Sequence, residues 1–175
     1  DITYGVNLNL RYKGFELSMF GQGVTGTKVN FSMENAWAFS DYASPRKYHL
    51  KRWTVDNPNP NAAYPRIYPR TSKHSTYNQY FSDYWLFNAD YFRIKNITLG
   101  YSLPENIIKK VRMQKARIYL ALENFFTFDN LNGLPIDPEA ISGYSMFNAE
   151  NYNSGRTGVG TPTFKSVSVG VQLNF

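Results

Sequence analysis

The chain has 175 residues, no cysteine and a formal net charge of +6 at pH 7. Aromatic residues make up 17% of it, with 14 Tyr and 13 Phe, yet the mean hydropathy is −0.46. The missing cysteines exclude a disulfide framework and thiolate metal sites, and no apolar run of about 18 residues is present that would form a membrane helix. A negative mean hydropathy together with many aromatic residues favours a β protein whose sheet has one face in water and one apolar face.

Five segments alternate between apolar and polar residues with a period of two, which is typical of a strand with two different faces. The expected strands span about residues 2–12, 15–24, 91–103, 116–126 and 164–175. In the last segment, Val167, Val169, Val171 and Leu173 alternate with small or polar residues up to Phe175.

Short and long connections alternate between these segments. A tight turn joins the first two and about a dozen residues join the third and fourth, whereas residues 26–89 and 129–162 form long connections. Compact domains rarely contain irregular loops beyond about 15 residues, but outer-membrane barrels combine short periplasmic turns with long extracellular loops. An apolar band about 25 Å tall also needs about 10 residues per tilted strand, as found here.

The sequence therefore predicts an all-β protein, a transmembrane antiparallel β-barrel, with 26–89 and 129–162 as extracellular loops. Because the smallest such barrels have about eight strands, five strands do not close a ring. We expect the chain to be the C-terminal part of a larger barrel whose other strands precede it. In the final strand, Ser168, Gly170, Leu173 and Phe175 resemble the C-terminal signal that bacterial barrel-assembly machinery recognises.

Several motifs are specific enough to indicate a family. They are YKGFELSMFGQGVTG (12–26), RWTVDNPNP (52–60), FNADYFRIKNITLGYSLP (87–104), RIYLALENFFTF (117–128), DPE (137–139) and PTFKSVSVGVQLNF (162–175). In this order they resemble SusC/RagA-type TonB-dependent outer-membrane transporters. Three departures are small: Asp90 stands where the family has a small residue, Leu173 replaces an aromatic residue, and Gly133 is separated from DPE by three residues.

The resemblance implies a plugged barrel of about 22 strands, of which this chain supplies about the last five. It implies import of a glycan or oligopeptide across the outer membrane of a Gram-negative, Bacteroidota-like cell. The expected partners are a SusD-like surface lipoprotein, the barrel-assembly machinery, membrane lipid, and the TonB complex acting through an N-terminal plug domain outside this chain. No enzymatic activity, cofactor or nucleic-acid partner is expected.

Trp37, Trp53 and Trp85 in the long loop are the candidate contacts to substrate or to the lipoprotein lid, because aromatic faces bind sugars and anchor protein interfaces. The competing interpretation is that the loop packs around its own aromatic core. His49 and His74 have no third ligand at a useful spacing, so no metal site is predicted.

Two other functions remain open from the sequence. A passive porin would share the barrel but lack the plug and the TonB-binding segment. A soluble β-sandwich that binds carbohydrate would fold as a soluble monomer from residues 1–175, whereas a barrel segment would expose an apolar face and require detergent.

Overall fold

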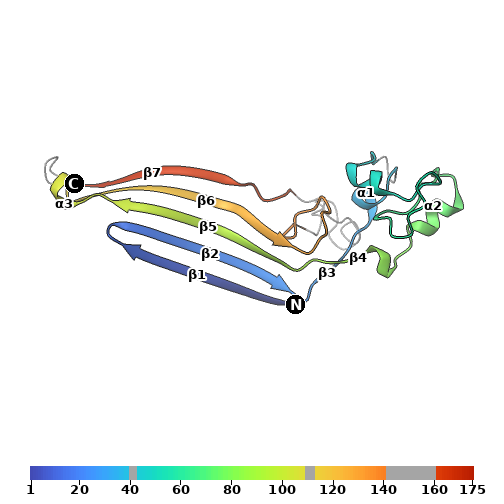
Figure 1. The fold of residues 1–175 in the computed structure, drawn as a ribbon, viewed down its shortest axis with the longest axis horizontal. Helices are drawn as coiled ribbons and strands as arrows, with labels where there is room; N and C mark the ends of the chain where they lie inside the picture. Colours follow the sequence, from blue (N-terminus) through green and yellow to red (C-terminus); the bar gives the residue numbers. More distant parts are fainter. Residues whose placement is uncertain (40–42, 109–112, 141–160) are drawn as a thin grey trace, which may run out of the picture. The chain divides into compact units, whose positions relative to one another are not determined.

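A computed structural model describes residues 1–39, 43–108, 113–140 and 161–175 (Figure 1). The chain divides into two units. The sheet unit comprises Asp1–Thr27, Asp90–Asn130 and Thr163–Phe175, and the loop unit comprises Lys28–Ala89 and Leu131–Pro162. Most of the predicted loop 129–162 lies outside the described residues. None of the helices in the described part of the chain has the length and hydrophobicity needed to cross a bilayer.

The sheet unit contains five antiparallel strands in the order β1-β2-β5-β6-β7 (Figure 1). Their bounds are β1 Ile2–Tyr12, β2 Phe15–Thr25, β5 Tyr91–Ser102, β6 Lys115–Asp129 and β7 Ser166–Asn174, and the short helix α3 (Glu105–Ile108) follows β5. The predicted antiparallel β architecture is confirmed. β6 continues three residues beyond its predicted end, because Asn124, with φ 53°, interrupts the alternation without ending the strand.

The hairpin between β1 and β2 explains the YKG motif. Lys13 and Gly14 both have positive φ, 45° and 84°. Two consecutive residues with positive φ are the requirement of a type I′ turn, whose twist matches that of the flanking strands. The turn therefore fixes the register that pairs Tyr12 with Phe15 and continues to Ile2 and Thr25.

Direct cross-strand pairing gives the sheet two chemically distinct faces. The apolar face contains three rows that cross all five strands: Leu8–Met19–Ile97–Leu122–Val167, Leu10–Leu17–Leu99–Leu120–Val169 and Tyr12–Phe15–Tyr101–Ile118–Val171. The polar face contains the rows Asn9–Ser18–Thr98–Ala121–Ser168 and Arg11–Glu16–Gly100–Tyr119–Gly170. Even on the inner strands the apolar face is open, since Leu99 and Ile118 are each 47% exposed.

Two glycines of β2 make room for aromatic rings on the apolar face. The register shifts between Phe20 and Gly21, and the ring of Phe92 then lies against Gly21. A Cβ on Gly23 would lie 2.7 Å from the backbone oxygen of Tyr91. The rings of Tyr4 and Phe92 stack at 6.0 Å. Glycine is needed here because large rings and a neighbouring backbone approach the strand closely.

The loop unit has its own secondary structure. It contains the two-stranded sheet β3 (Lys28–Asn30) and β4 (Leu86–Asn88), the helices α1 (Met33–Ala36) and α2 (Lys73–Asn78), and the 3-10 helices η2 (Lys47–Lys51) and η3 (Asp83–Trp85). Its main core consists of the buried residues Phe31, Ala36, Tyr64 and Trp85, and a second cluster contains Val29, Ala89 and Leu131. The long connection is therefore a packed substructure and not an irregular loop.

Candidate functional site

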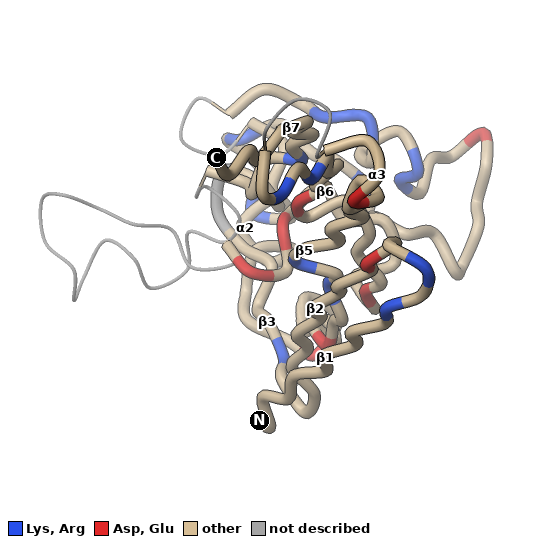
Figure 2. The backbone as a smooth tube through the Cα atoms, turned by 90° about the vertical axis from the view of Figure 1, so that its left-hand side faces the viewer, with Lys and Arg blue, Asp and Glu red and all other residues tan. Residues whose placement is uncertain are grey.

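A charged cluster lies on the polar face near the β1–β2 turn. The Glu16 carboxylate on β2 forms an ion pair with Arg117 on β6 at 3.1 Å and a second with Arg11 on β1 at 3.6 Å. The Arg117 guanidinium also lies 5.6 Å from the centre of the Tyr119 ring. Lys and Arg as well as Asp and Glu occur along the strands of this sheet (Figure 2). Charges that are so placed on one face, opposite a continuous apolar face, fit a wall with water on one side only.

Asp90 fastens the other end of the sheet. Its carboxylate accepts hydrogen bonds from the Thr25 hydroxyl at 3.1 Å and from the Thr27 backbone N–H at 3.0 Å. Asp90 is one of the three departures from the family motifs, and these two bonds give it a structural role. Nearby, the buried Arg93 donates to the hydroxyls of Thr127 and Thr163, which ties β5 to β6 and to the chain that leads into β7.

The core of the loop unit holds a histidine in a fixed tautomer. His49 is 2% exposed, its Nδ1 accepts from the Arg46 backbone N–H at 2.7 Å, and its Nε2 lies 2.9 Å from the Ala36 carbonyl. Nε2 must therefore carry the proton. Burial lowers the pKa of His49; the Ala36 carbonyl opposes this change, and the positive charges of Arg46 and Arg52 add to it.

Two tyrosines beside His49 are held in the neutral form. Burial raises the pKa of Tyr64 to about 12, and it also raises the pKa of Tyr48. The Tyr64 hydroxyl accepts a hydrogen bond from the Ala38 backbone N–H at 3.2 Å. Trp85 packs against Tyr64 at a ring distance of 5.6 Å and donates from its indole N–H to the Asn78 carbonyl at 2.8 Å. This core is aromatic, and hydrogen bonds fix His49, Tyr64 and Trp85, while the buried Tyr48 hydroxyl has no hydrogen-bond partner among the described residues.

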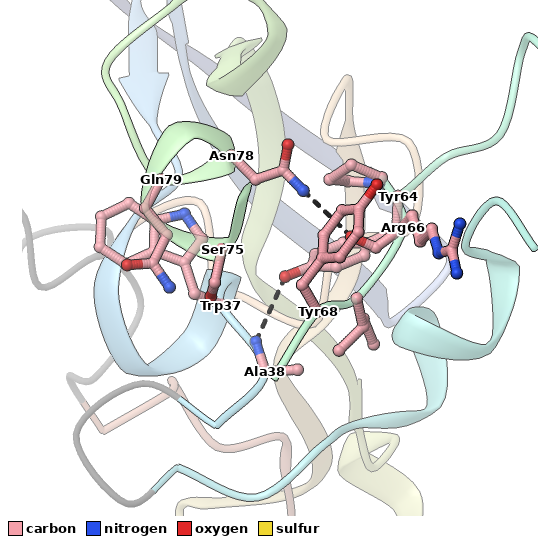
Figure 3. Close-up of a pocket in the computed structure, with 10 residues that line it drawn as sticks. Trp37, Ala38, Tyr64, Arg66, Tyr68, Ser75, Asn78 and Gln79 are labelled. Carbon is pink, nitrogen blue, oxygen red and sulfur yellow. Dashed lines mark hydrogen bonds between the residues drawn. The ribbon is translucent and has the colours of Figure 1, made fainter. Parts of the chain in front are cut away.

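A small cavity lies beside the core (Figure 3). Trp37, Ser75 and Gln79 line one side of it and Tyr68 the other, with Asn78 donating to the Arg66 carbonyl at 3.0 Å. The indole nitrogen of Trp37 is buried and has no hydrogen-bond partner among the described residues. The cavity volume of roughly 20 Å³ holds about one water molecule and is too small for a sugar ring.

A larger and open groove of roughly 410 Å³ lies on the surface of the loop unit. Trp53, Pro60, Tyr68 and Tyr84 supply its apolar walls, and Arg66 is the charged side chain among its described lining residues. The Arg66 guanidinium lies 5.8 Å from the Trp53 ring and 5.2 Å from the Tyr68 ring. In Figure 3 its side chain points away from the small cavity. It is one of two open grooves of similar size in the described loop unit; the other, of roughly 460 Å³, is lined by Phe39, Ala43, Ser44, Pro45, Pro69 and Arg70 and has no tryptophan.

The three predicted tryptophans lie in three different surroundings. Trp85 is 3% exposed and belongs to the core, Trp37 borders the small cavity, and Trp53 borders the open groove. The sequence interpretation did not identify Arg66 as the partner of Trp53. The high density of Lys and Arg in this segment is the signal that could have indicated it. The spacing of aromatic residues alone does not show which of them are buried and which lie at the surface.

The predicted assembly residues all lie in or next to β7. Ser168 lies in a polar row, and Gly170 lies against the Tyr119 ring, where a side chain would collide with it. Leu173 pairs with Ala116, and Phe175 follows the strand with 74% of its surface exposed. His74 lies 5.1 Å from the Tyr68 ring, and in the described part of the chain no three His, Cys, Asp or Glu residues are grouped to hold a metal ion.

Comparison with known proteins finds TonB-dependent receptors whose sequences are similar to this chain. No family model matches the chain. TonB-dependent receptor P3 of Formosa agariphila is 27% identical over an alignment of 178 positions, which covers the whole chain and 16% of that receptor. TonB-dependent receptor SusC of Bacteroides thetaiotaomicron is 29% identical over 151 positions, which cover 82% of the chain and 13% of SusC.

Comparison with solved structures also finds transporters of the RagAB type. The RagAB peptide transporter matches 98% of the chain with a TM-score of 0.64 and 25% identity, over 17% of the matched chain. The similarity to SusC/RagA-type TonB-dependent transporters is thereby confirmed. The RagAB peptide importer in its "closed-closed" state matches 99% of the chain, and 17% of that chain, with a TM-score of 0.61 and 24% identity.

The chain therefore spans only 13% to 17% of the length of these relatives and solved chains. Within that part, the five-stranded sheet corresponds to a segment of a transporter barrel, and the relatives are named as receptors and transporters and not as enzymes.

Proposed function

We propose that the chain forms part of the barrel wall and an extracellular loop of a TonB-dependent transporter that imports a nutrient across the bacterial outer membrane. The observation that carries the proposal is the apolar face of the sheet, which is exposed even on inner strands and lies opposite a charged and polar face. A soluble sheet covers such a face with a second layer. A barrel wall leaves it open because lipid covers it.

Closure of the barrel requires more strands than these five. β1 and β7 are the edges of the sheet, and an open edge has no hydrogen-bond partner in lipid. We propose that further strands of a longer protein pair with both edges and complete a ring of about 22 strands around a plug. Ser168, Gly170, Leu173 and Phe175 then supply the signal for the assembly machinery.

The loop unit lies outside the cell in this proposal, and the β1–β2 and β5–β6 connections lie in the periplasm. A SusD-like lipoprotein is the proposed lid, and TonB acts through the plug. The similarity to the RagAB peptide transporter supports an oligopeptide as the nutrient, and a glycan, which the family resemblance of the sequence also implies, is the alternative.

Spin labels on adjacent residues of β7 test the orientation of the sheet. In the full-length protein in lipid vesicles, a label at Val169→Cys should collide more often with oxygen than with a water-soluble nickel complex, because lipid surrounds it. A label at Ser168→Cys is the matched control and should show the reverse. Low collision rates with both reagents at Val169 would place it in a packed protein interior and overturn the proposal.

Deletion of TonB in the native host tests the energy source. Import that depends on this protein should stop when TonB is absent, because a plugged barrel does not open by itself. A passive porin would continue to conduct. Uptake that is unchanged without TonB would therefore contradict the proposed mechanism even if the spin-label result holds.

A further inference from the structure

We propose that the groove around Trp53 and Arg66 is a binding site for an acidic oligopeptide, with the Arg66 guanidinium as the group that holds a peptide carboxylate. This inference rests on the proposed function, because it names the substrate class that the extracellular loop would select.

The positive charge of the chain is concentrated in one segment of the loop unit. Residues 43–82 contain seven Lys or Arg and a single acidic residue, Asp56, out of 19 basic and 13 acidic residues in the whole chain. The rest of the chain is therefore neutral overall, and the whole net charge of +6 belongs to this segment. A basic surface attracts anionic ligands and accelerates their association.

Arg66 is fixed at the groove in a geometry that favours carboxylate binding. Its guanidinium lies within 5.8 Å of the Trp53 ring and 5.2 Å of the Tyr68 ring, so two aromatic residues restrict its rotation. Among the described residues no carboxylate lies within ion-pair distance of it. A planar fork of N–H donors that is already oriented loses little entropy on forming two parallel bonds to a carboxylate.

The groove adds apolar walls to this charge. Pro60 and Tyr84 line it together with the two rings, and Asn59 contributes an amide. The Asn59 side-chain oxygen accepts from the Asn61 N–H at 2.9 Å, so the N–H groups of the same amide are the part of it that can donate to a ligand. The site therefore combines one cation, amide donors and apolar surface, which are the groups that an acidic peptide with apolar neighbours requires.

The same geometry favours a peptide over a sugar. Sugars bind to open aromatic faces, but the Arg66 guanidinium lies over the rings of both Trp53 and Tyr68. An extended peptide instead places a carboxylate on the guanidinium and an apolar side chain against the walls. We therefore assign the site to a peptide and treat an acidic oligosaccharide as a competing outcome of the test.

The test measures binding by calorimetry to the full-length protein in detergent. The probes are a hexapeptide of Asp, Glu and Leu, the same peptide with Asn and Gln in place of the acids, and a hexamer of galacturonic acid. Arg66→Gln removes the fork, and Arg70→Gln is the matched control because it removes the same charge from the same segment. Heat-resistant migration on gels verifies that each variant remains folded.

We expect Arg66→Gln to weaken binding of the acidic hexapeptide by about tenfold or more, which is the usual loss for a charge-assisted hydrogen bond. Arg70→Gln should weaken it less than about threefold, which is the size of a screened surface charge effect. The amide peptide should bind weakly to all three proteins.

If both variants lost the same amount of affinity for the acidic hexapeptide, the effect would come from net charge alone, and the proposed site at Arg66 would be wrong. Tighter binding of the galacturonate hexamer, lost in Arg66→Gln, would overturn the assignment to a peptide. These results are independent of import. TonB-dependent uptake with no effect of Arg66→Gln on peptide binding would refute this inference and leave the proposed function intact.

Discussion

The loop unit buries some of its aromatic residues in a core, whereas the described part of the sheet unit has no buried aromatic residue. In the sheet, Tyr12 and Phe15 are 70% and 54% exposed, whereas in the loop unit Phe31 and Trp85 are 1% and 3% exposed. The sheet obtains its order from backbone pairing and leaves rings such as those of Tyr12 and Phe15 uncovered. The loop unit has only two three-residue strands in its described part and is ordered by its core. We attribute the difference to the surroundings of the two units, with lipid proposed around the sheet unit and water around the loop unit.

Removal of a core ring from the loop unit should have the largest effect. Trp85→Ala deletes a buried indole and its hydrogen bond to Asn78, and we expect it to destabilise the loop unit by about 3–5 kcal/mol. Limited proteolysis of the full-length protein in membranes should then cleave within residues 28–89, while the barrel still migrates as a heat-resistant species. Trp53→Ala is the control, because Trp53 lies at the open groove and should cost much less. Equal proteolysis of the two variants would contradict a core centred on Trp85.

A charge on the apolar face should have the next largest effect. Leu120→Arg introduces a guanidinium in the middle apolar row, and we expect it to lower the free energy of unfolding by about 2–4 kcal/mol in lipid vesicles. Ala121→Arg is the matched control, since it adds the same charge one residue later on the polar face. Urea titrations of both variants measure the difference. A cost that is similar for the two positions would remove the distinction between the faces.

The sequence predicted the sheet much better than the loop unit, and the reason is physical. A strand that borders lipid on one face and water on the other must alternate apolar and polar side chains. The alternation around Leu99 and Leu120 therefore predicted these strands without a structure. The pattern broke at the irregularity near Asn124, because a bulge is set by pairing with the neighbouring strand. In the loop unit no period applies, so the sequence could not tell that Trp85 is buried and Trp53 lines a groove.

Acid should weaken the loop unit more than the sheet. The pKa of His49 is lowered by burial from the 6.5 of a free side chain, so the unfolded loop binds a proton at a higher pH than the folded loop does. The contribution of His49 is therefore complete above about pH 6.5 and decreases as the pH falls through that value. Protonation would also remove the Nδ1 acceptor for the Arg46 N–H.

Proteolysis rates between pH 8 and pH 5, measured with an acid-tolerant protease, test this dependence. The wild-type loop should become more susceptible at the acidic end, and His49→Gln should abolish the dependence on pH. His74→Gln is the control, because His74 is exposed on α2 and lies outside the core. A His74→Gln variant that also loses the dependence would assign the effect to a different group.

The smallest effect is expected at the charged cluster, and its smallness is informative. Glu16→Gln removes the carboxylate shared by Arg11 and Arg117. If the polar face borders water, as proposed, each pair contributes at most about 1 kcal/mol and the effect decreases further at high salt. If that face were instead sealed in a dry protein interior, two arginines would lose their counter-ion and the cost would reach about 3–5 kcal/mol. Urea titration of Glu16→Gln in vesicles at low and high salt therefore measures how wet the polar face is, independently of any label or ligand. A large cost that does not depend on salt would contradict a water-filled lumen on this side of the sheet.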